Sequence, residues 1–198
     1  IPSLVTKEGV FFDNHVEFVK HFLKGQIAME DVRRELMAQA AKMERTGLPL
    51  THVDSHQHMH MLPGVIDISL DVAASLHLDA VRISRTPLFT AFAGMGQLIG
   101  RLGLFTLSEL SLWKAKRRHF RVPDHFEGIV AGEAVHEGHF LHILKDLRPG
   151  TTEVMMHPGT DNSRLIPACD WEHDFEAEMQ AIVSPKVRRM IADKAVKV

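Results

Sequence analysis

The sequence predicts an α/β protein on three observations. Apolar residues recur at spacings of three and four in several stretches, which is typical of amphipathic helices. Short apolar segments of extended character lie between these stretches. One of them, at 51–56, is followed by a helix and then by a second strand at 80–83. A strand, a helix and a further strand in this order are typical of a parallel sheet.

Two helices are predicted near the start of the chain, at 13–24 and 28–45. The second carries one apolar stripe, formed by Met29, Val32, Leu36, Ala40 and Met43. On its outer face, Glu30 and Arg34 have the spacing of a helical ion pair, and we expect them to bond to each other.

The remaining predicted elements are, in chain order, a helix at 63–76, strands at 80–83 and 126–131, a helix at 136–147, a strand at 152–156, a helix at 170–182 and a helix that begins at Pro185. Residues 90–120, which glycines interrupt, are predicted to form an insertion or lid. No linker divides the chain, so we expect a single α/β domain over 1–198. Four strand signals are too few to close a barrel of about eight strands, which indicates that further strands precede Ile1.

Composition excludes several classes of protein. The chain has 198 residues, with 23 Lys and Arg against 25 Asp and Glu, so its net charge of −2 gives no general affinity for nucleic acid. Its single cysteine, Cys169, cannot form an internal disulfide, which favours a reducing cytoplasm. No apolar run approaches the roughly 20 residues of a membrane span, so we expect no transmembrane segment.

The most informative segment is rich in histidine. Nitrogen or oxygen donors occupy every second position of 51–61, namely His52, Asp54, His56, His58 and His60. On an extended backbone all five would share one face, about 6.6 Å apart from one to the next, so neighbours can share a metal but the whole set cannot. Imidazole and carboxylate donors without thiolate suit Zn, Mn, Fe, Co, Ni or Mg. Asp54 is then either a ligand or the carboxylate that orients an imidazole. A solvent-facing histidine-rich strand is the alternative.

Two further residues are candidates for chemistry. An apolar strand ends in His157, Pro158 and Gly159, and it presents this imidazole at the same edge as the first cluster if the strands are parallel. A histidine at this place suits proton transfer to a leaving amine, although a structural role is the alternative. Arg82 lies in a predicted buried strand and needs a carboxylate partner there, either at a site or in an ordinary ion pair.

Together these segments resemble a known family. The resemblance is carried by Thr51-His52-Val53-Asp54-Ser55-His56-Gln57-His58-Met59-His60, by Arg82-Ile83-Ser84-Arg85, by Asp124-His125-Phe126-Glu127-Gly128 and by residues 153–159. Their order and spacing are similar to the YdjC-like family of metal-dependent carbohydrate deacetylases, which includes chitooligosaccharide deacetylases and a branch associated with hopanoid biosynthesis. The similarity runs from Ile1 to about Val187.

The resemblance implies a divergent TIM-barrel-like fold and a hydrolase that removes an N-acetyl group from an amino sugar or oligosaccharide by metal-activated water. It also implies one divalent metal ion, Mg or Zn, and a homodimer. By position, His56 corresponds to a metal ligand, and His157 to the histidine of a late strand-end motif, which we assign as the acid.

Other assignments complete the expected site. Arg82 and Asp54 are the further catalytic candidates, and His52, His58 and His60 are secondary candidates for the metal. The family's paired aspartates and an earlier metal-binding histidine are expected before Ile1, so the fragment by itself is expected to hold metal poorly and to be inactive. Two alternatives stay open, namely another His/Asp metallohydrolase, such as a phosphoesterase or cyclic-amide hydrolase, and a non-catalytic metal-binding scaffold.

Overall fold

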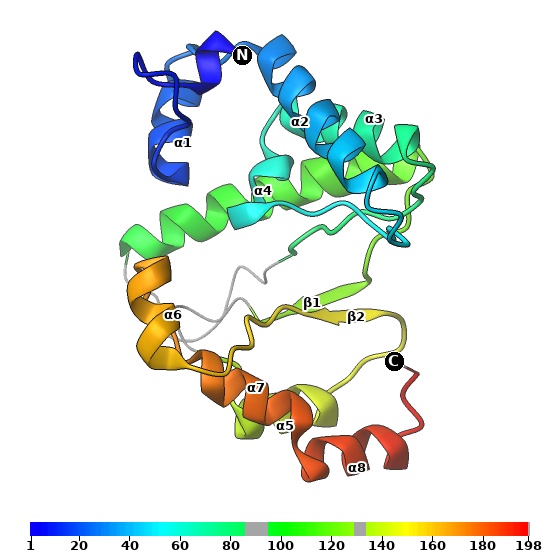
Figure 1. Cartoon of the computed structure of the whole chain (residues 1–198). Coiled ribbons are helices and arrows are strands. Elements are labelled where there is room, and N and C mark those ends of the chain that lie inside the picture. Colours follow the sequence, from blue (N-terminus) through cyan, green and yellow to red (C-terminus); the bar gives the residue numbers. More distant parts are fainter. Residues whose placement is uncertain (86–94, 129–133, 198) are drawn as a thin grey trace. The chain divides into compact units, whose positions relative to one another are not determined.

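A computed structural model describes residues 1–85, 95–128 and 134–197 of the chain. The chain divides into two compact units, Ile1–Val122 and Pro123–Val198 (Figure 1). Helices predominate in the described residues and accompany a small parallel sheet, which confirms the α/β class. Closure into a TIM-like barrel and the single-domain organisation stay predictions.

The first unit is built mainly of helices. Its elements are the short 3-10 helix η1 (Pro2–Leu4), α1 (His15–Leu23), α2 (Met29–Glu44), the 3-10 element η2 (His56–Met61), α3 (Val65–Ser75) and α4 (Met95–Arg117). The helices predicted at 13–24, 28–45 and 63–76 are confirmed to within two residues at either end. Helix α1 begins where it does because the Asn14 side chain accepts a hydrogen bond from the Glu17 backbone N–H at 3.1 Å.

Parallel pairing in this unit is limited to single bridges. Val53 pairs with Val81, and Ala80 pairs with Arg121, in both cases in parallel. The strands predicted at 51–56 and 80–83 are therefore real as extended segments but much shorter as ladders. Their order along the chain, with α3 between the first two, is the expected strand, helix, strand arrangement.

Helix α3 is the centre of the first unit. Ile66 and Leu70 enter one apolar cluster, whereas Val65 and Val72 enter another. A helix that is apolar on nearly all sides must be covered on nearly all sides. Accordingly, α3 packs against α2 and against α4, and Figure 1 shows α2 and α3 side by side.

Helix α4 occupies most of the region predicted as a lid. Leu112 and Ala115, near its end, are buried in the same cluster as Ile66. This end of α4 therefore belongs to the core of the first unit. Residues 90–94 of the predicted lid lie outside the described residues, and a lid role stays a prediction.

The ion pair predicted between Glu30 and Arg34 is wrong. Arg34 bonds instead to the Asp31 carboxylate at 2.6 Å. That carboxylate also accepts hydrogen bonds from the backbone N–H and the hydroxyl of Ser3, each at 2.8 Å. These bonds from Ser3, with the Arg34 contact, hold the pKa of Asp31 below its ordinary value. A charge fixed in this way is the better partner for Arg34, and it ties η1 to α2.

The second unit contains the short sheet. Its elements are β1 (His125–Glu127), α5 (Glu137–Lys145), β2 (Thr152–Val154), α6 (Asn162–Cys169), α7 (Phe175–Val183) and α8 (Pro185–Asp193). Strands β1 and β2 are parallel, with Phe126 opposite Glu153, and α5 connects them. Helices α5, α7 and α8 pack against one another. Residues 129–131 of the predicted strand at 126–131 lie outside the described residues.

One predicted helix of this unit is wrong at its start. The prediction of a helix over 170–182 merged α7 with the region before it and missed α6. Asp170 takes a left-handed conformation, with φ 47°, and ends α6. Helix α7 begins later, at Phe175, where the Asp174 side chain accepts from the Ala177 N–H. Helix α6 contains Pro167, a residue whose low helix propensity argues against a helix at this place. The start of α8 at Pro185 is confirmed.

Within the described parts of the chain, no helix has both the length and the apolar character that crossing a bilayer requires.

Candidate functional site

The histidine-rich segment does not continue as a strand. After the bridge at Val53 the chain coils into η2, in which Gln57 and His58 have φ of 50° and 58°. The expectation that all five donors line one face of a strand is therefore wrong. Alternation holds only while the backbone is extended, and the turn sends His60 into the interior while His56 stays exposed.

His60 is held inside the first unit by two hydrogen bonds. Its side chain is 2% exposed, and its Nε2–H donates to the Arg82 carbonyl oxygen at 2.7 Å. A carbonyl can only accept, so Nε2 carries a proton, and Nδ1 lies 2.8 Å from the Ser55 hydroxyl, which donates to it in the neutral imidazole. The Ser55 oxygen in turn accepts the backbone N–H of His60 at 2.9 Å. Nε2 thus joins η2 to the segment around Arg82, whereas Nδ1 binds Ser55 at the start of η2.

The other candidate ligands lie nearer the surface. The exposed His56 ring stands edge-on to the ring of His15, with 6.0 Å between the centroids. His52 is exposed and bonds to the Thr51 hydroxyl at 2.9 Å, and His58 Nδ1 lies 2.9 Å from the Ser84 hydroxyl oxygen. No motif in the sequence pointed to His15, which reaches this place on the first turn of α1.

Arg82 has the carboxylate partner that its position required. Its guanidinium group bonds directly to Asp54 Oδ2. The backbone N–H of Arg82 also donates to the Val53 carbonyl at 3.0 Å, so the two segments are joined by main chain and side chain together. The other oxygen of Asp54 lies 4.0 Å from His60 Nδ1. The three predicted residues Asp54, His60 and Arg82 therefore form one connected group.

A second group lies in the second unit, and it includes the predicted acid. His157, His173 and Glu178 each offer a ligand atom within 4.8 Å of the others, the one such trio of His, Cys, Asp or Glu among the residues the structure describes. Two imidazoles and a carboxylate are a donor set that suits a divalent cation. His173 and Glu178 are buried, with 3% and 2% of their side chains exposed, whereas His157 is partly exposed.

Glu178 connects the members of this trio. Oε2 accepts the backbone N–H of His157, and Oε1 accepts that of Val135 at 2.9 Å. His173 Nε2 lies 3.2 Å from Oε1, which is close enough for an ion pair. This contact does not have the angles of a hydrogen bond. Within the described residues, neither ring nitrogen of His173 makes a hydrogen bond of good geometry.

Sequence reasoning missed His173 and Glu178. One signal was available for Glu178, because Phe175, Glu178 and Ala181 follow one another at intervals of three and all three are buried on α7. A carboxylate on the buried stripe of a helix demands partners. No comparable pattern marks His173, whose neighbours in the sequence are acidic and aromatic.

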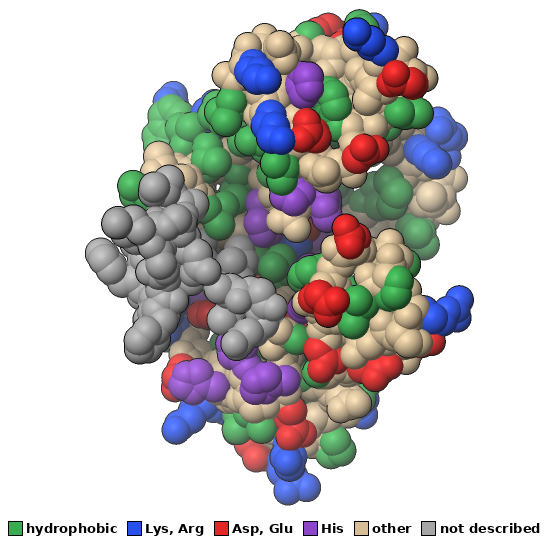
Figure 2. All heavy atoms as spheres, turned by 90° about the vertical axis from the view of Figure 1, so that its left-hand side faces the viewer, with side chains coloured by type: hydrophobic (Ala, Val, Ile, Leu, Met, Phe, Trp, Pro, Cys, Tyr) green, Lys and Arg blue, Asp and Glu red, His purple; other side chains and the backbone are tan. Residues whose placement is uncertain are grey.

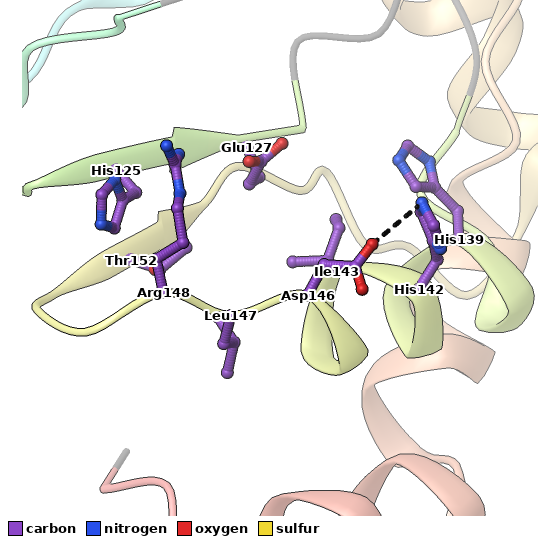
Figure 3. Close-up of a pocket in the computed structure, with 9 residues that line it drawn as sticks. All are labelled: His125, Glu127, His139, His142, Ile143, Asp146, Leu147, Arg148 and Thr152. Atoms are coloured by element: carbon purple, nitrogen blue, oxygen red, sulfur yellow. Dashed lines mark ion pairs between the residues drawn. The ribbon is translucent and has the colours of Figure 1, made fainter.

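The second unit also has an open pocket, shown in Figure 3. Its empty volume is about 500 Å³, and its lining comes from both ends of β1, from the start of β2, from α5 and from the loop that follows α5. His142 and Asp146 lie 3.5 Å apart on its wall. His157, in contrast, follows the end of β2. Ligands of parallel α/β proteins bind at the carboxyl ends of strands, and His157 does not line this pocket.

The two groups of histidines belong to different units. His56 is in the first unit and His157 in the second, so their meeting in one pocket stays a prediction. Histidine side chains reach the surface in small groups, coloured purple in Figure 2. Clustered imidazoles and carboxylates are donor types that suit a divalent cation.

Comparison with known proteins is more specific. Residues 1–193 match the family described as YdjC-like protein, and the chain belongs to this family. It is 29% identical to a protein of Mus musculus named carbohydrate deacetylase, with 98% of this chain and 68% of that protein covered. A carbohydrate deacetylase of Homo sapiens is also 29% identical, with 98% and 65% covered. One of Brevibacillus brevis is 23% identical, with 99% and 68% covered.

These matches confirm the resemblance drawn from the histidine-rich segments, and they place the chain in a family that has enzymes named carbohydrate deacetylase among its members. The chain spans about two thirds of the length of these relatives.

Proposed function

We propose that the intact protein is a metal-dependent hydrolase that removes an N-acetyl group from an amino sugar or oligosaccharide, giving acetate and a free amine. The observation that carries this proposal is the family match over residues 1–193, which includes both the segment around His56 and the segment around His157. Relatives named carbohydrate deacetylase align along nearly the whole chain and support it.

His56 is the proposed metal ligand in this chain. Its imidazole is exposed at the first turn of η2, and it stands beside a second imidazole, that of His15. This donor set suits Zn, whereas Mg would need added oxygen ligands, for which Asp54 is the nearest candidate in the sequence. When bound, the cation polarises the amide carbonyl and lowers the pKa of water.

His157 is the proposed acid. An amide anion is a very poor leaving group, so the nitrogen must receive a proton as the C–N bond breaks. The partly exposed ring of His157 follows the end of β2, the end of a parallel strand at which catalytic groups gather. Arg82 fixes the Asp54 carboxylate by a direct ion pair, and we propose that this carboxylate orients a neighbouring imidazole or binds the cation.

The larger assembly follows the same proposal. Membership of the family supports a TIM-barrel-like fold and a homodimer for the intact protein, and the parallel bridges at Val53 and Ala80 agree with such a fold. A chain with one cysteine suits a reducing cytoplasm.

Acetate release from N,N′-diacetylchitobiose by the full-length protein tests the proposal. We expect activity that a chelator abolishes and that a divalent metal restores. His56→Ala should remove activity and metal binding together, whereas His157→Ala should leave only a small residual activity and retain the metal. His119→Asn, at an exposed turn with φ 61°, is the matched control and should leave both unchanged.

Three outcomes contradict parts of the proposal. Unchanged turnover in either histidine variant rejects the role given to that residue. Release of phosphate from phosphoesters without acetate release indicates another metallohydrolase. Metal binding without turnover of any acetylated sugar indicates a non-catalytic scaffold.

A further inference from the structure

Glu178 is a buried carboxylate that the proposed reaction does not use. With 1% of its surface exposed, it lies on the face of α7 that also buries Phe175 and Ala181. Burial of a charge is costly unless hydrogen bonds and partners compensate. Here the compensation comes from two backbone N–H groups, those of Val135 and His157, and from the nearby His173 imidazole.

The contact with His157 is the informative one. The N–H that Glu178 accepts belongs to the residue that carries the proposed acid, three positions after the end of β2. A charge-assisted hydrogen bond of this kind fixes the backbone from which the imidazole projects. A movement of that backbone would move the ring with it.

Two aromatic rings fix the direction of the His157 side chain. The ring of Trp171 meets the His157 ring edge-on, with centroids 4.9 Å apart at 86°, and the ring of His173 does so at 5.5 Å and 84°. Trp171 and His173 stack on each other at 4.1 Å, with 23° between their planes. The stacked pair forms a wall of adjoining rings that restricts the rotamers of His157.

We infer that Glu178, Trp171 and His173 are positioning residues for His157: Glu178 fixes its backbone, and the stacked rings fix the orientation of its imidazole. This inference rests on the proposed function of His157 as the acid. The alternative, a cation bound by His157, His173 and Glu178, would have to share a carboxylate whose two oxygens already accept backbone N–H groups.

A double-mutant cycle in the full-length protein tests the inference. Glu178→Gln keeps the shape of the side chain but turns an NH₂ group toward one of the two backbone donors. We expect its kcat for acetate release to fall about 10- to 100-fold with KM changed less than about 3-fold, because a small misplacement of a catalytic group costs that much. In a His157→Ala background the same substitution should lower the residual rate less than about 3-fold, since Glu178 acts through His157.

The matched control is Glu176→Gln. Glu176 lies on the same helix, but its carboxylate accepts the backbone N–H of Asn162, at 3.0 Å, where Glu178 accepts that of His157. Its kcat should stay within about 2-fold of the wild type. A second variant, Trp171→Leu, removes the aromatic ring beside His157. Trp171 is 36% exposed, so this substitution does not disturb a buried charge as Glu178→Gln does. It should show the same loss of kcat and the same dependence on His157.

The inference is overturned if Glu178→Gln and Trp171→Leu reduce kcat equally in the presence and absence of His157, which would make both residues merely structural. It is also overturned if the protein holds one Zn per chain that His173→Phe removes and His56→Ala retains, since the trio would then be a metal site.

Failure of the proposed function can be told apart from failure of this inference. If the wild type releases no acetate, amide hydrogen exchange still reports on the positioning, because exchange at the His157 backbone N–H should accelerate in Glu178→Gln and not in Glu176→Gln. Unaltered exchange in Glu178→Gln overturns the inference without reference to activity.

Discussion

Replacement of His60 by alanine should destabilise the protein strongly, although the sequence pattern around this histidine predicts a metal site. The imidazole is buried and makes two hydrogen bonds, to the Arg82 carbonyl at 2.7 Å and to the Ser55 hydroxyl at 2.8 Å. His60→Ala removes both bonds and empties the space of the ring. The segment η2 would then lose the bond from His60 to the segment around Arg82 and keep the one from His58 to Ser84.

The size of the effect follows from these contacts. Two hydrogen bonds contribute about 1 kcal/mol each, or about 2 kcal/mol together. Loss of a buried ring adds about 1–3 kcal/mol, by comparison with other large-to-small substitutions in cores. We therefore expect the free energy of unfolding to fall by about 3–5 kcal/mol, a large part of the roughly 5–15 kcal/mol of an ordinary domain.

Urea unfolding, followed by far-UV circular dichroism at pH 7, measures this difference. His52→Ala is the control, because its ring is exposed and bonds only with the adjacent Thr51 among the contacts described, and it should change the free energy by less than about 0.5 kcal/mol. A loss below about 1 kcal/mol in His60→Ala, or one equal to that of His52→Ala, would refute the structural role given to His60.

Two other predictions concern backbone and charge. Gly128 has φ 95°, and a Cβ there would overlap the Met155 carbonyl oxygen, so Gly128→Ala should lower the free energy of unfolding by at least about 2 kcal/mol. In the same urea assay Gly103→Ala, on α4 with no atom within 4 Å of the added Cβ, should be neutral or slightly stabilising; equal losses at the two glycines would contradict the reasoning. Burial raises the pKa of Asp71, but ion pairs with two arginines outweigh it and leave the pKa below its ordinary value of 3.8. A lowered carboxyl pKa stabilises the fold above the ordinary value, and this contribution is lost as the pH falls through the lowered one. Asp71→Asn should therefore cost stability at pH 7, and this cost should shrink steadily as the pH falls below 3.8, whereas a cost independent of pH would show that the charge is not involved.

Much of the helical structure follows from local patterns in the sequence. The apolar stripe of 28–45 predicted α2 to within one residue at each end, and Pro185 predicted the start of α8. Spacing, caps and prolines act over one or two turns, so a short window contains the information. The residues that identify the family, from His52 to His60 and around His157, were likewise visible without a structure, and the family match confirmed what they indicated.

Local patterns failed where distant residues decide the conformation. An alternating row of donors predicts one face of a strand, yet η2 coils because His60 is drawn inward by bonds to Ser55 and to Arg82, the latter 22 positions away. Arg34 pairs with Asp31 because hydrogen bonds from Ser3, far earlier in the chain, hold that carboxylate in place.

The sequence by itself determined the α/β class, most of the helices and the family, because the patterns that indicate them lie in neighbouring positions. The tertiary structure decided which of those residues are buried, which are bonded to one another, and that Glu178, 21 positions after His157, accepts its backbone N–H. Such contacts depend on how helices and strands pack, and the burial of a polar group forces a partner that no local pattern names.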